Sequence, residues 1–193
     1  MKHLLAALLL ILAIGPAQSG ETAERPKVRI VTNMGSIEAV LYADKAPETV
    51  KNFLRYVDEG FYDGTVFHRV ISSFMIQGGG FDTQLQRKPT HEPIRNEAAN
   101  GLKNRRGTLA MARTMDPHSA TAQFFINVVD NPFLDYKSPR NGRTFGYAVF
   151  GKVTHGMDVV DKIRFVETGP GGPFPKDVPQ TPVIIEKIER IQP

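Results

Sequence analysis

The 193-residue chain contains no cysteine, and this absence excludes several kinds of chemistry. Without thiols the protein can form no disulfide framework and cannot use a cysteine nucleophile. A lipoprotein anchor on an N-terminal cysteine is excluded for the same reason. The missing cysteines say little about the cellular compartment, because a domain of this size buries a core large enough to be stable without disulfides.

Sequence patterns for metal, phosphate and hydrolase chemistry are absent as well. The histidines His68, His91, His118 and His155 are scattered, with no pair at metal-ligand spacing, and His68 is expected to be a strand residue that makes structural hydrogen bonds. The run Gly78–Gly80 lacks the lysine and hydroxyl residue of a phosphate loop, so close backbone approach or a bulge is expected there. No Gly-x-Ser-x-Gly elbow of an α/β-hydrolase occurs.

Positive charge is only slightly in excess: the chain has 24 lysines and arginines, 20 acidic residues and a net charge of +4. This balance favours solubility and at most weak attraction to anionic surfaces. The densest basic stretch, Lys103–Arg106, has no interleaved aromatic residues for base stacking. A solvated loop is therefore expected there rather than a nucleic-acid site.

One unbroken hydrophobic run occurs near the start, Leu4–Ile14, and it is shorter than the about 20 residues of a transmembrane helix. A short basic start precedes it, Gly15-Pro16 breaks any helix, and Ala17–Ser19 offers small residues at signal-peptidase spacing. A membrane anchor or a buried N-terminal helix are the alternatives, and the pattern favours export. We expect a signal peptide at 1–19 cut after Ser19, a short extension at 20–26, one domain at 27–193, and no stable membrane anchor after cleavage.

Short strands dominate the domain. Charged or polar and apolar residues alternate over Lys27–Thr32, turn at Asn33–Gly35 and resume over Ser36–Tyr42, which predicts a β-hairpin. Further strands are expected at Val66–Val70, Met75–Gly78, Thr108–Arg113, Gln123–Val128, Tyr147–Val153 and Val183–Ile191. Many short strands with few helices indicate an antiparallel barrel or sandwich.

Two helices are expected beside these strands. The first begins at Ala46-Pro47-Glu48, with proline in its first turn and an acid near the positive end of its dipole, and Gly60 ends it. Its apolar stripe consists of Val50, Phe53, Leu54 and Val57. The second helix covers Met157–Arg164, and Gly169–Pro182, rich in glycine and proline, is expected to be an ordered surface loop.

The run Phe67–Gly80 reads Phe-His-Arg-Val-Ile-Ser-Ser-Phe-Met-Ile-Gln-Gly-Gly-Gly. It places one fixed cation, Arg69, in an otherwise apolar segment, ahead of large apolar side chains and one amide. This run resembles the signature of cyclophilins, the cyclophilin-type peptidyl-prolyl cis-trans isomerases. The resemblance continues in order through Gly107–Ala112, Gln123–Ile126 and Phe150–Val153. With the predicted export signal, the chain resembles the bacterial exported (periplasmic) cyclophilins.

The resemblance implies a mainly β fold, a closed eight-stranded antiparallel barrel capped by two α-helices. Such a barrel is just wide enough to be filled by side chains, so the site would lie in a groove on its outer wall. The implied activity is prolyl cis-trans isomerisation of unfolded or partly folded polypeptides by a monomer. No cofactor or metal is needed, because no bond is made or broken.

Arg69 matches the catalytic arginine that the resemblance implies. A donor aimed at the prolyl nitrogen draws its lone pair out of conjugation and binds the twisted amide better than either planar state. Taken in isolation, Arg69 would be interpreted as an exposed or salt-bridged strand residue. The surrounding signature favours the catalytic role.

The resemblance also implies the substrate-binding residues. They are Phe74, Met75, Phe125 and Leu134 for the proline pocket; Gln77, Gln123 and the backbone at Ala112-Arg113 for the peptide chain; and Phe133 and Tyr147 where many eukaryotic cyclophilins carry tryptophan and histidine. Strand alternation supports one part of this set from the residues alone. Gln123 and Phe125 share a face that should be the groove, as do Met75 and Gln77, whereas Phe124 and Ile126 should face the core.

Phe133 lacks the indole N–H of tryptophan, so weak cyclosporin binding is expected. Two other functions are weighed: a proline-directed peptide-binding or chaperone module with incidental catalysis, and an adhesive or scaffold protein of the envelope. A pure binder does not need Arg69, and the repeats typical of a scaffold are not found in the sequence. The sequence therefore favours an exported isomerase, periplasmic if the source is a two-membrane bacterium.

Overall fold

The computed structural model describes residues 25–191. The predicted signal peptide, 1–19, lies outside the described residues, as do residues 20–24 of the predicted extension. Within 25–191 no helix has the length and apolar character needed to cross a bilayer.

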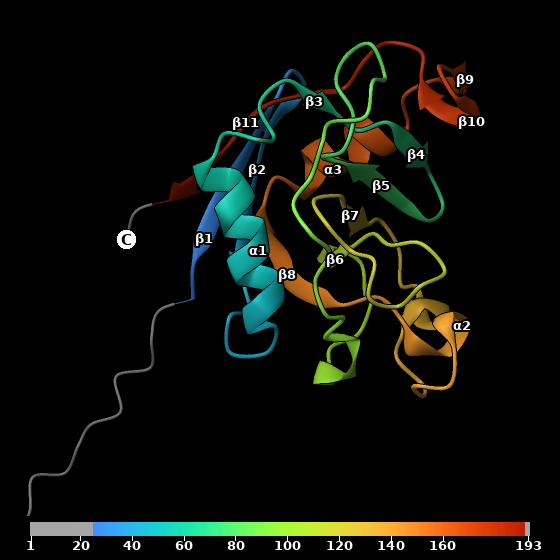
Figure 1. The fold of residues 1–193 in the computed structure, drawn as a ribbon. Helices are drawn as coiled ribbons and strands as arrows, with labels where there is room; N and C mark the ends of the chain where they lie inside the picture. Colours follow the sequence, from blue (N-terminus) through green and yellow to red (C-terminus); the bar gives the residue numbers. More distant parts are fainter. Residues whose placement is uncertain (1–24, 192–193) are drawn as a thin grey trace, which may run out of the picture.

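Nine strands form one curled antiparallel sheet (Figure 1). Their bounds are β1 Lys27–Thr32, β2 Gly35–Leu41, β3 Thr65–Val66, β4 Arg69–Ile71, β5 Met75–Gly78, β6 Thr108–Met111, β7 Phe124–Asn127, β8 Val149–His155 and β11 Ile184–Ile191. The order across the sheet is β3-β11-β1-β2-β8-β6-β7-β5-β4. The mainly β architecture and the N-terminal hairpin are thus confirmed, with strand ends displaced by a few residues.

The expected closed eight-stranded barrel is not confirmed. β3 and β4 are the two edge strands of the sheet, and within residues 25–191 no backbone ladder joins them to close a barrel. The single strand predicted at Val66–Val70 is wrong, because the chain breaks at Phe67 and His68, so that β3 pairs with β11 and β4 with β5. Both side chains at the break are buried, and the Phe67 N–H donates to the Val183 carbonyl at 2.9 Å. The sheet is therefore an open half-barrel whose two end strands follow one another in the chain.

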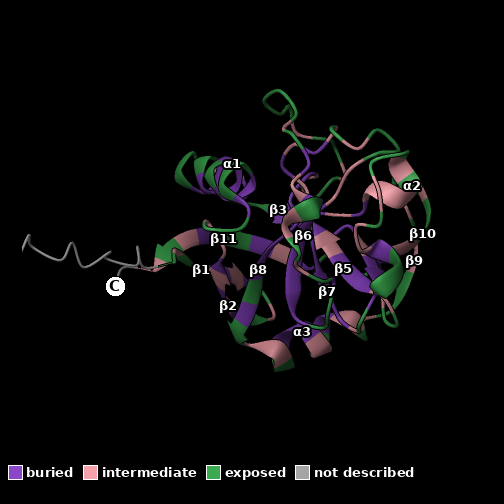
Figure 2. Ribbon diagram, turned by 90° about the horizontal axis from the view of Figure 1, so that it is seen from below, coloured by how far each residue is buried: buried purple, intermediate pink, exposed green. Residues whose placement is uncertain are grey.

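The two predicted helices reach the inside of the curled sheet from two directions. They are α1, Pro47–Asp58, and α3, Met157–Arg164, the second with the predicted bounds. In Figure 2, α1 lies above and α3 below the strands. Apolar residues of both helices join the inner faces of the strands in the main core; on α1 they are Val50, Phe53, Leu54 and Val57, and on α3 Val159, Val160 and Ile163. The short helix α2, Gly142–Phe145, and the 3₁₀ turns η1, Ala98–Asn100, and η2, Pro132–Leu134, were not predicted.

Phe53 fixes α1 on the sheet. Its ring centroid lies 5.1 Å from that of Phe150 on β8 and 5.4 Å from that of Phe124 on β7, with the second pair edge to face. Tilted and edge-to-face aromatic pairs add about 0.5–1.5 kcal/mol each beyond the area that they bury. The packing holds β7 and β8 against the helix, and their other faces are left to carry further side chains.

The first turn of α1 is capped from a distant part of the chain. Ala46, at the N-cap, offers no side-chain acceptor. The Glu97 carboxylate instead accepts hydrogen bonds from the N–H groups of Glu48 and Thr49, at 3.2 and 2.8 Å, and from the Thr49 hydroxyl at 2.7 Å. This satisfies donors that a helix start leaves unpaired, and it places a negative charge at the positive end of the dipole.

Replacing Glu97 with alanine is expected to lower the free energy of unfolding by about 0.5–2 kcal/mol, the usual cost of losing a cap. For a domain of this size the melting temperature should fall by roughly 1–8 °C. Calorimetry of Glu97→Ala beside Glu92→Ala, an exposed glutamate nearby, measures the effect. Equal melting temperatures of the two variants would contradict the capping role.

The segment Gly169–Pro182 is not the loop that its composition predicted. β9, Thr168–Gly171, and β10, Phe174–Pro179, form a separate two-stranded hairpin. Its prolines and glycines hide the alternation by which a strand is recognised, and its register is broken between Phe174 and Val178. The Phe174 ring packs at 5.5 Å from His68, which joins the hairpin to the chain just before β4.

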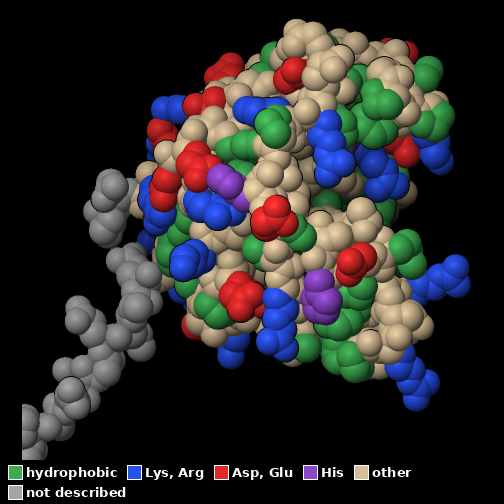
Figure 3. Space-filling view, in the orientation of Figure 1, with side chains coloured by type: hydrophobic (Ala, Val, Ile, Leu, Met, Phe, Trp, Pro, Cys, Tyr) green, Lys and Arg blue, Asp and Glu red, His purple; other side chains and the backbone are tan. Residues whose placement is uncertain are grey.

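Charges of both signs are interspersed over the face that includes α1, rather than gathered into a patch of one sign (Figure 3). Several of them pair: Arg190 with Asp58 at 2.6 Å, and His91 with Glu59 at 2.7 Å. This distribution offers no basic stripe of the kind that binds nucleic acid on the face shown.

Candidate active site

Strand register brings the predicted site residues into a row on one face of the sheet. Arg69 on β4 pairs with Gln77 on β5, Gln77 with Phe125 on β7, and Phe125 with Ala110 on β6. Directly opposed residues on neighbouring strands place their side chains on the same face. A cation, an amide and an aromatic ring thus lie side by side, although they are far apart in the sequence.

The opposite face of the same strands belongs to the main core. Phe124, Ile126 and Ile76 are fully buried there. The predicted alternation along Gln123–Val128 is confirmed for these core positions, since Phe125 is excluded from the main core and joins a different group of side chains.

That group, here called the outer cluster, is a second apolar assembly separate from the core. It consists of buried Met75, Ala110, Phe125, Leu134 and Val149, with Ile71, Phe74, Leu102, Ala112 and Tyr147 packed against it. Two ring contacts involve its members: Phe74 with Phe133, which lies beside the cluster, at 5.5 Å, and Phe125 with Tyr147 at 5.8 Å. Phe133 is 59% exposed, so one side of its ring faces solvent.

The two predicted glutamines contact each other beside the outer cluster. Gln77 Nε2 donates to Gln123 Oε1 at 3.0 Å. Gly80 makes room for this pair, because a Cβ at that position would lie 2.4 Å from Gln123 Cγ. The close approach expected of the glycine run is confirmed at this residue. Each amide keeps donor or acceptor capacity that the pair does not use.

The side chain of Arg113 is used within the protein. Its Nε donates to the Gly146 carbonyl at 3.0 Å, its Nη2 to the Gly142 carbonyl at 2.7 Å, and its guanidinium lies 4.3 Å from the Tyr147 ring centroid. The Ala112 N–H donates to the Gln123 carbonyl at 2.9 Å and is not free for a ligand. Arg113 thus holds Tyr147 in place, a role that the sequence did not predict.

A buried asparagine network supports the outer cluster and was also missed. Asn131 Nδ2 donates to the carbonyl of Phe74 at 2.9 Å and to Asn127 Oδ1 at 2.7 Å, and Asn127 Nδ2 reaches Asn104 Oδ1 at 3.2 Å. The one feature of the sequence that points to this network is Asn127, which ends the apolar run of β7. The network fixes Phe74 and the start of η2 relative to β7.

His68, next to Arg69, does not behave as the strand residue that was expected. It lies between β3 and β4, 3% exposed, with its ring 4.6 Å from Phe81 and 5.5 Å from Phe174, and its Nδ1 has no hydrogen-bond partner within residues 25–191. Burial lowers the pKa of His68 to about 4, so the ring is uncharged at neutral pH.

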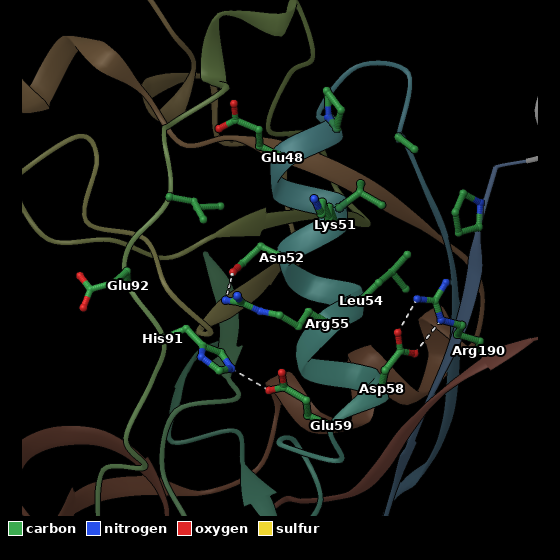
Figure 4. Close-up of a pocket in the computed structure, with 15 residues that line it drawn as sticks. Glu48, Lys51, Asn52, Leu54, Arg55, Asp58, Glu59, His91, Glu92 and Arg190 are labelled. Atoms are coloured by element: carbon green, nitrogen blue, oxygen red, sulfur yellow. Dashed lines mark hydrogen bonds and ion pairs between the residues drawn. The ribbon is translucent and has the colours of Figure 1, made fainter.

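A surface depression of about 1000 Å³ lies elsewhere, along the exposed side of α1 (Figure 4). Its labelled side chains are largely engaged with one another, Arg190 with Asp58 and His91 with Glu59. None of the predicted site residues lines it. We place the candidate site on the outer cluster because that is where cation, amides and apolar side chains converge.

Known proteins resemble this chain over almost all of its described length. A family model for "Cyclophilin type peptidyl-prolyl cis-trans isomerase/CLD" matches residues 27–190. "Peptidyl-prolyl cis-trans isomerase B" of Escherichia coli is 62% identical over 81% of this chain and 94% of its own length. "Peptidyl-prolyl cis-trans isomerase A" of Dickeya dadantii is 50% identical over 99% of this chain and 98% of its own.

Solved structures resemble the fold as well. A cyclophilin type peptidyl-prolyl cis-trans isomerase of Cryptosporidium parvum superposes with a TM-score of 0.69 at 28% identity, covering 88% of this chain and 99% of that one. A second structure of that protein, determined in the presence of the dipeptide Ala-Pro, gives a TM-score of 0.68 at 28% identity, covering 86% and 99%.

Proposed function

The chain belongs to the cyclophilin-type peptidyl-prolyl cis-trans isomerases, and from this premise we propose that Arg69 polarises the prolyl nitrogen of a peptide bound on the outer cluster. The observation that carries the proposal is the register row, which aligns Arg69 with Gln77 and Phe125 on one face. A structure of the Cryptosporidium relative was determined in the presence of the dipeptide Ala-Pro, and this supports a proline-containing ligand.

The reaction is rotation about a peptide bond whose resonance creates a barrier of about 18–20 kcal/mol. The Arg69 guanidinium is a planar cation that presents rigidly placed N–H groups, and its side chain is 41% exposed. A hydrogen bond from a charged donor contributes about 1.5–3 kcal/mol, or roughly 10- to 100-fold in rate. The remaining acceleration comes from the apolar surroundings, because a twisted amide is less polar than a planar one and loses less on leaving water.

The predicted residues other than Ala112 then have places in the proposal. The proline ring would pack against Phe125, Met75 and Leu134, and the free amide groups of Gln77 and Gln123 would hold the peptide backbone. Phe74, Phe133 and Tyr147 would form the walls, with Arg113 behind Tyr147. The test is isomerisation of a short X-Pro peptide by wild type and Arg69→Ala, with peptide binding measured in parallel so that a binding module is distinguished from a catalyst.

We further propose that the protein is exported and acts as a monomer on unfolded or partly folded polypeptides. The Dickeya relative aligns over 99% of the chain, so the likeness extends into the N-terminal segment before residue 27. In a two-membrane bacterium the mature protein would be periplasmic. N-terminal sequencing of the protein purified from the exported fraction is expected to begin at Gly20. Recovery of protein that still begins at Met1 would contradict the signal peptide.

A further inference from the structure

The β9–β10 hairpin brings a carboxylate to Arg69. Asp177 Oδ2 lies 3.9 Å from Arg69 Nε, and the side chain of Asp177 is 21% exposed. Within residues 25–191 the Arg69 guanidinium has no other ion pair or hydrogen bond. Asp177 is therefore the one ion-pair partner of this cation within residues 25–191.

The backbone at Asp177 is unusual. Its φ of 66° lies in the left-handed region, which residues other than glycine seldom occupy and which aspartate tolerates better than most. The register of β10 against β9 shifts between Phe174 and Val178, so Asp177 lies where the strand pairing is irregular. Irregular pairing re-aims side chains, and left-handed residues persist where the surrounding structure imposes them. Both features act on the residue that faces Arg69.

The hairpin that carries Asp177 is held firmly beside β4. Phe174 packs on His68 and Phe81 at ring distances of 5.5 and 5.1 Å, and Val178, the neighbour of Asp177, is 5% exposed. Contacts of residues on both sides of Asp177 in the chain therefore hold it in place. One of the contacted residues, His68, directly precedes Arg69 in the sequence.

Other cations near Asp177 do not compete for its carboxylate. Arg164 lines the same shallow depression, but its Nη1 donates to the Val128 carbonyl at 3.1 Å and its Nε lies 3.3 Å from Asp161 Oδ1. Burial keeps the pKa of His68 near 4, so that ring is neutral. The charge of Asp177 therefore acts on Arg69.

We infer that Asp177 is a positioning residue that holds the Arg69 guanidinium in its productive orientation, an inference that rests on the proposed role of Arg69. The carboxylate faces Nε, and the two Nη groups stay available as donors. A long side chain without this partner would sample several rotamers, and the productive one would be populated less often. The loss should appear in kcat more than in KM.

The test uses Asp177→Asn, because asparagine has nearly the same size and tolerates the left-handed backbone. We expect kcat/KM to fall about 2- to 5-fold, the range of a partly exposed ion pair, with KM little changed. Asp177→Gly, which adopts the same backbone easily, should give the same loss. In an Arg69→Ala background, Asp177→Asn should change kcat/KM by less than about 1.5-fold, since coupled residues are non-additive.

The matched control is Asp58→Asn, which removes the same charge from the ion pair between Asp58 on α1 and Arg190 on β11 (Figure 4). It should leave kcat/KM unchanged. NMR supplies a readout independent of turnover: the Arg69 Nε–H signal should shift and exchange faster in Asp177→Asn and not in Asp58→Asn.

Two kinetic outcomes overturn the inference. One is an unchanged or increased kcat/KM in both Asp177 variants, and the other is an equal loss with and without Arg69. If Arg69→Ala itself retains wild-type turnover, the proposed catalytic role fails separately. In that case the NMR signal of Arg69 Nε–H is the remaining test of the positioning role. If its shift and exchange rate are the same in Asp177→Asn as in wild type, the positioning role is refuted.

Discussion

Arg69→Ala is expected to lower kcat/KM for a prolyl peptide by about 10- to 100-fold, the equivalent of one hydrogen bond from a charged donor. Peptide affinity should fall much less, because the donor acts mainly on the twisted state and the outer cluster still binds the planar peptide. Protease-coupled or NMR exchange assays give the rate, and titration of a non-turning-over peptide analogue gives the affinity.

A control arginine of equal exposure is present on β1. The Arg29 side chain is 41% exposed, as is that of Arg69, and it pairs with Glu38 away from the outer cluster. Arg29→Ala should keep the wild-type rate. Arg69→Lys should restore little activity, because an ammonium does not reproduce the planar fork of donors. Wild-type turnover in a folded Arg69→Ala would favour the binding-module alternative.

The faces of the strands could be predicted from the sequence because alternation is a local property. Alternation assigns Phe124 and Ile126 to the core, and both are fully buried there. The row from Arg69 through Gln77 to Phe125 could not be derived in the same way, since it depends on how distant strands pair. From the sequence, only the family resemblance predicts that these three residues belong to one site.

What the sequence missed depends on tertiary contacts. The break at Phe67-His68 follows from two neighbouring side chains that are both buried, against the alternation of a strand. The hairpin that carries Asp177 is rich in proline and glycine and is recognised only by its pairing. Arg113 resembles a surface cation in the sequence, and its role emerges when the carbonyls of Gly142 and Gly146 converge on it.

Phe133→Trp is expected to tighten cyclosporin binding by about 5- to 150-fold while it changes isomerase turnover little. Cyclosporin binding in cyclophilins is associated with a tryptophan at the matching position, whose indole N–H can donate to a drug carbonyl. Phenylalanine offers no donor, and an unsatisfied buried carbonyl costs about 1–3 kcal/mol, which gives this range of affinity. The affinity of wild type and of Phe133→Trp for cyclosporin is measured from the isomerase activity that remains as the drug is titrated in.

The structure favours this substitution at Phe133 itself. The ring packs against Phe74 in a tilted arrangement at 5.5 Å and is 59% exposed, so a larger indole has space on its solvent side without repacking Met75 or Phe125. Phe165→Trp supplies the matched control, since that ring is 67% exposed and lies outside the outer cluster. It should leave drug affinity unchanged. If wild type is already inhibited as tightly as Phe133→Trp, the indole donor is not what decides drug affinity, and apolar contact with the ring is enough.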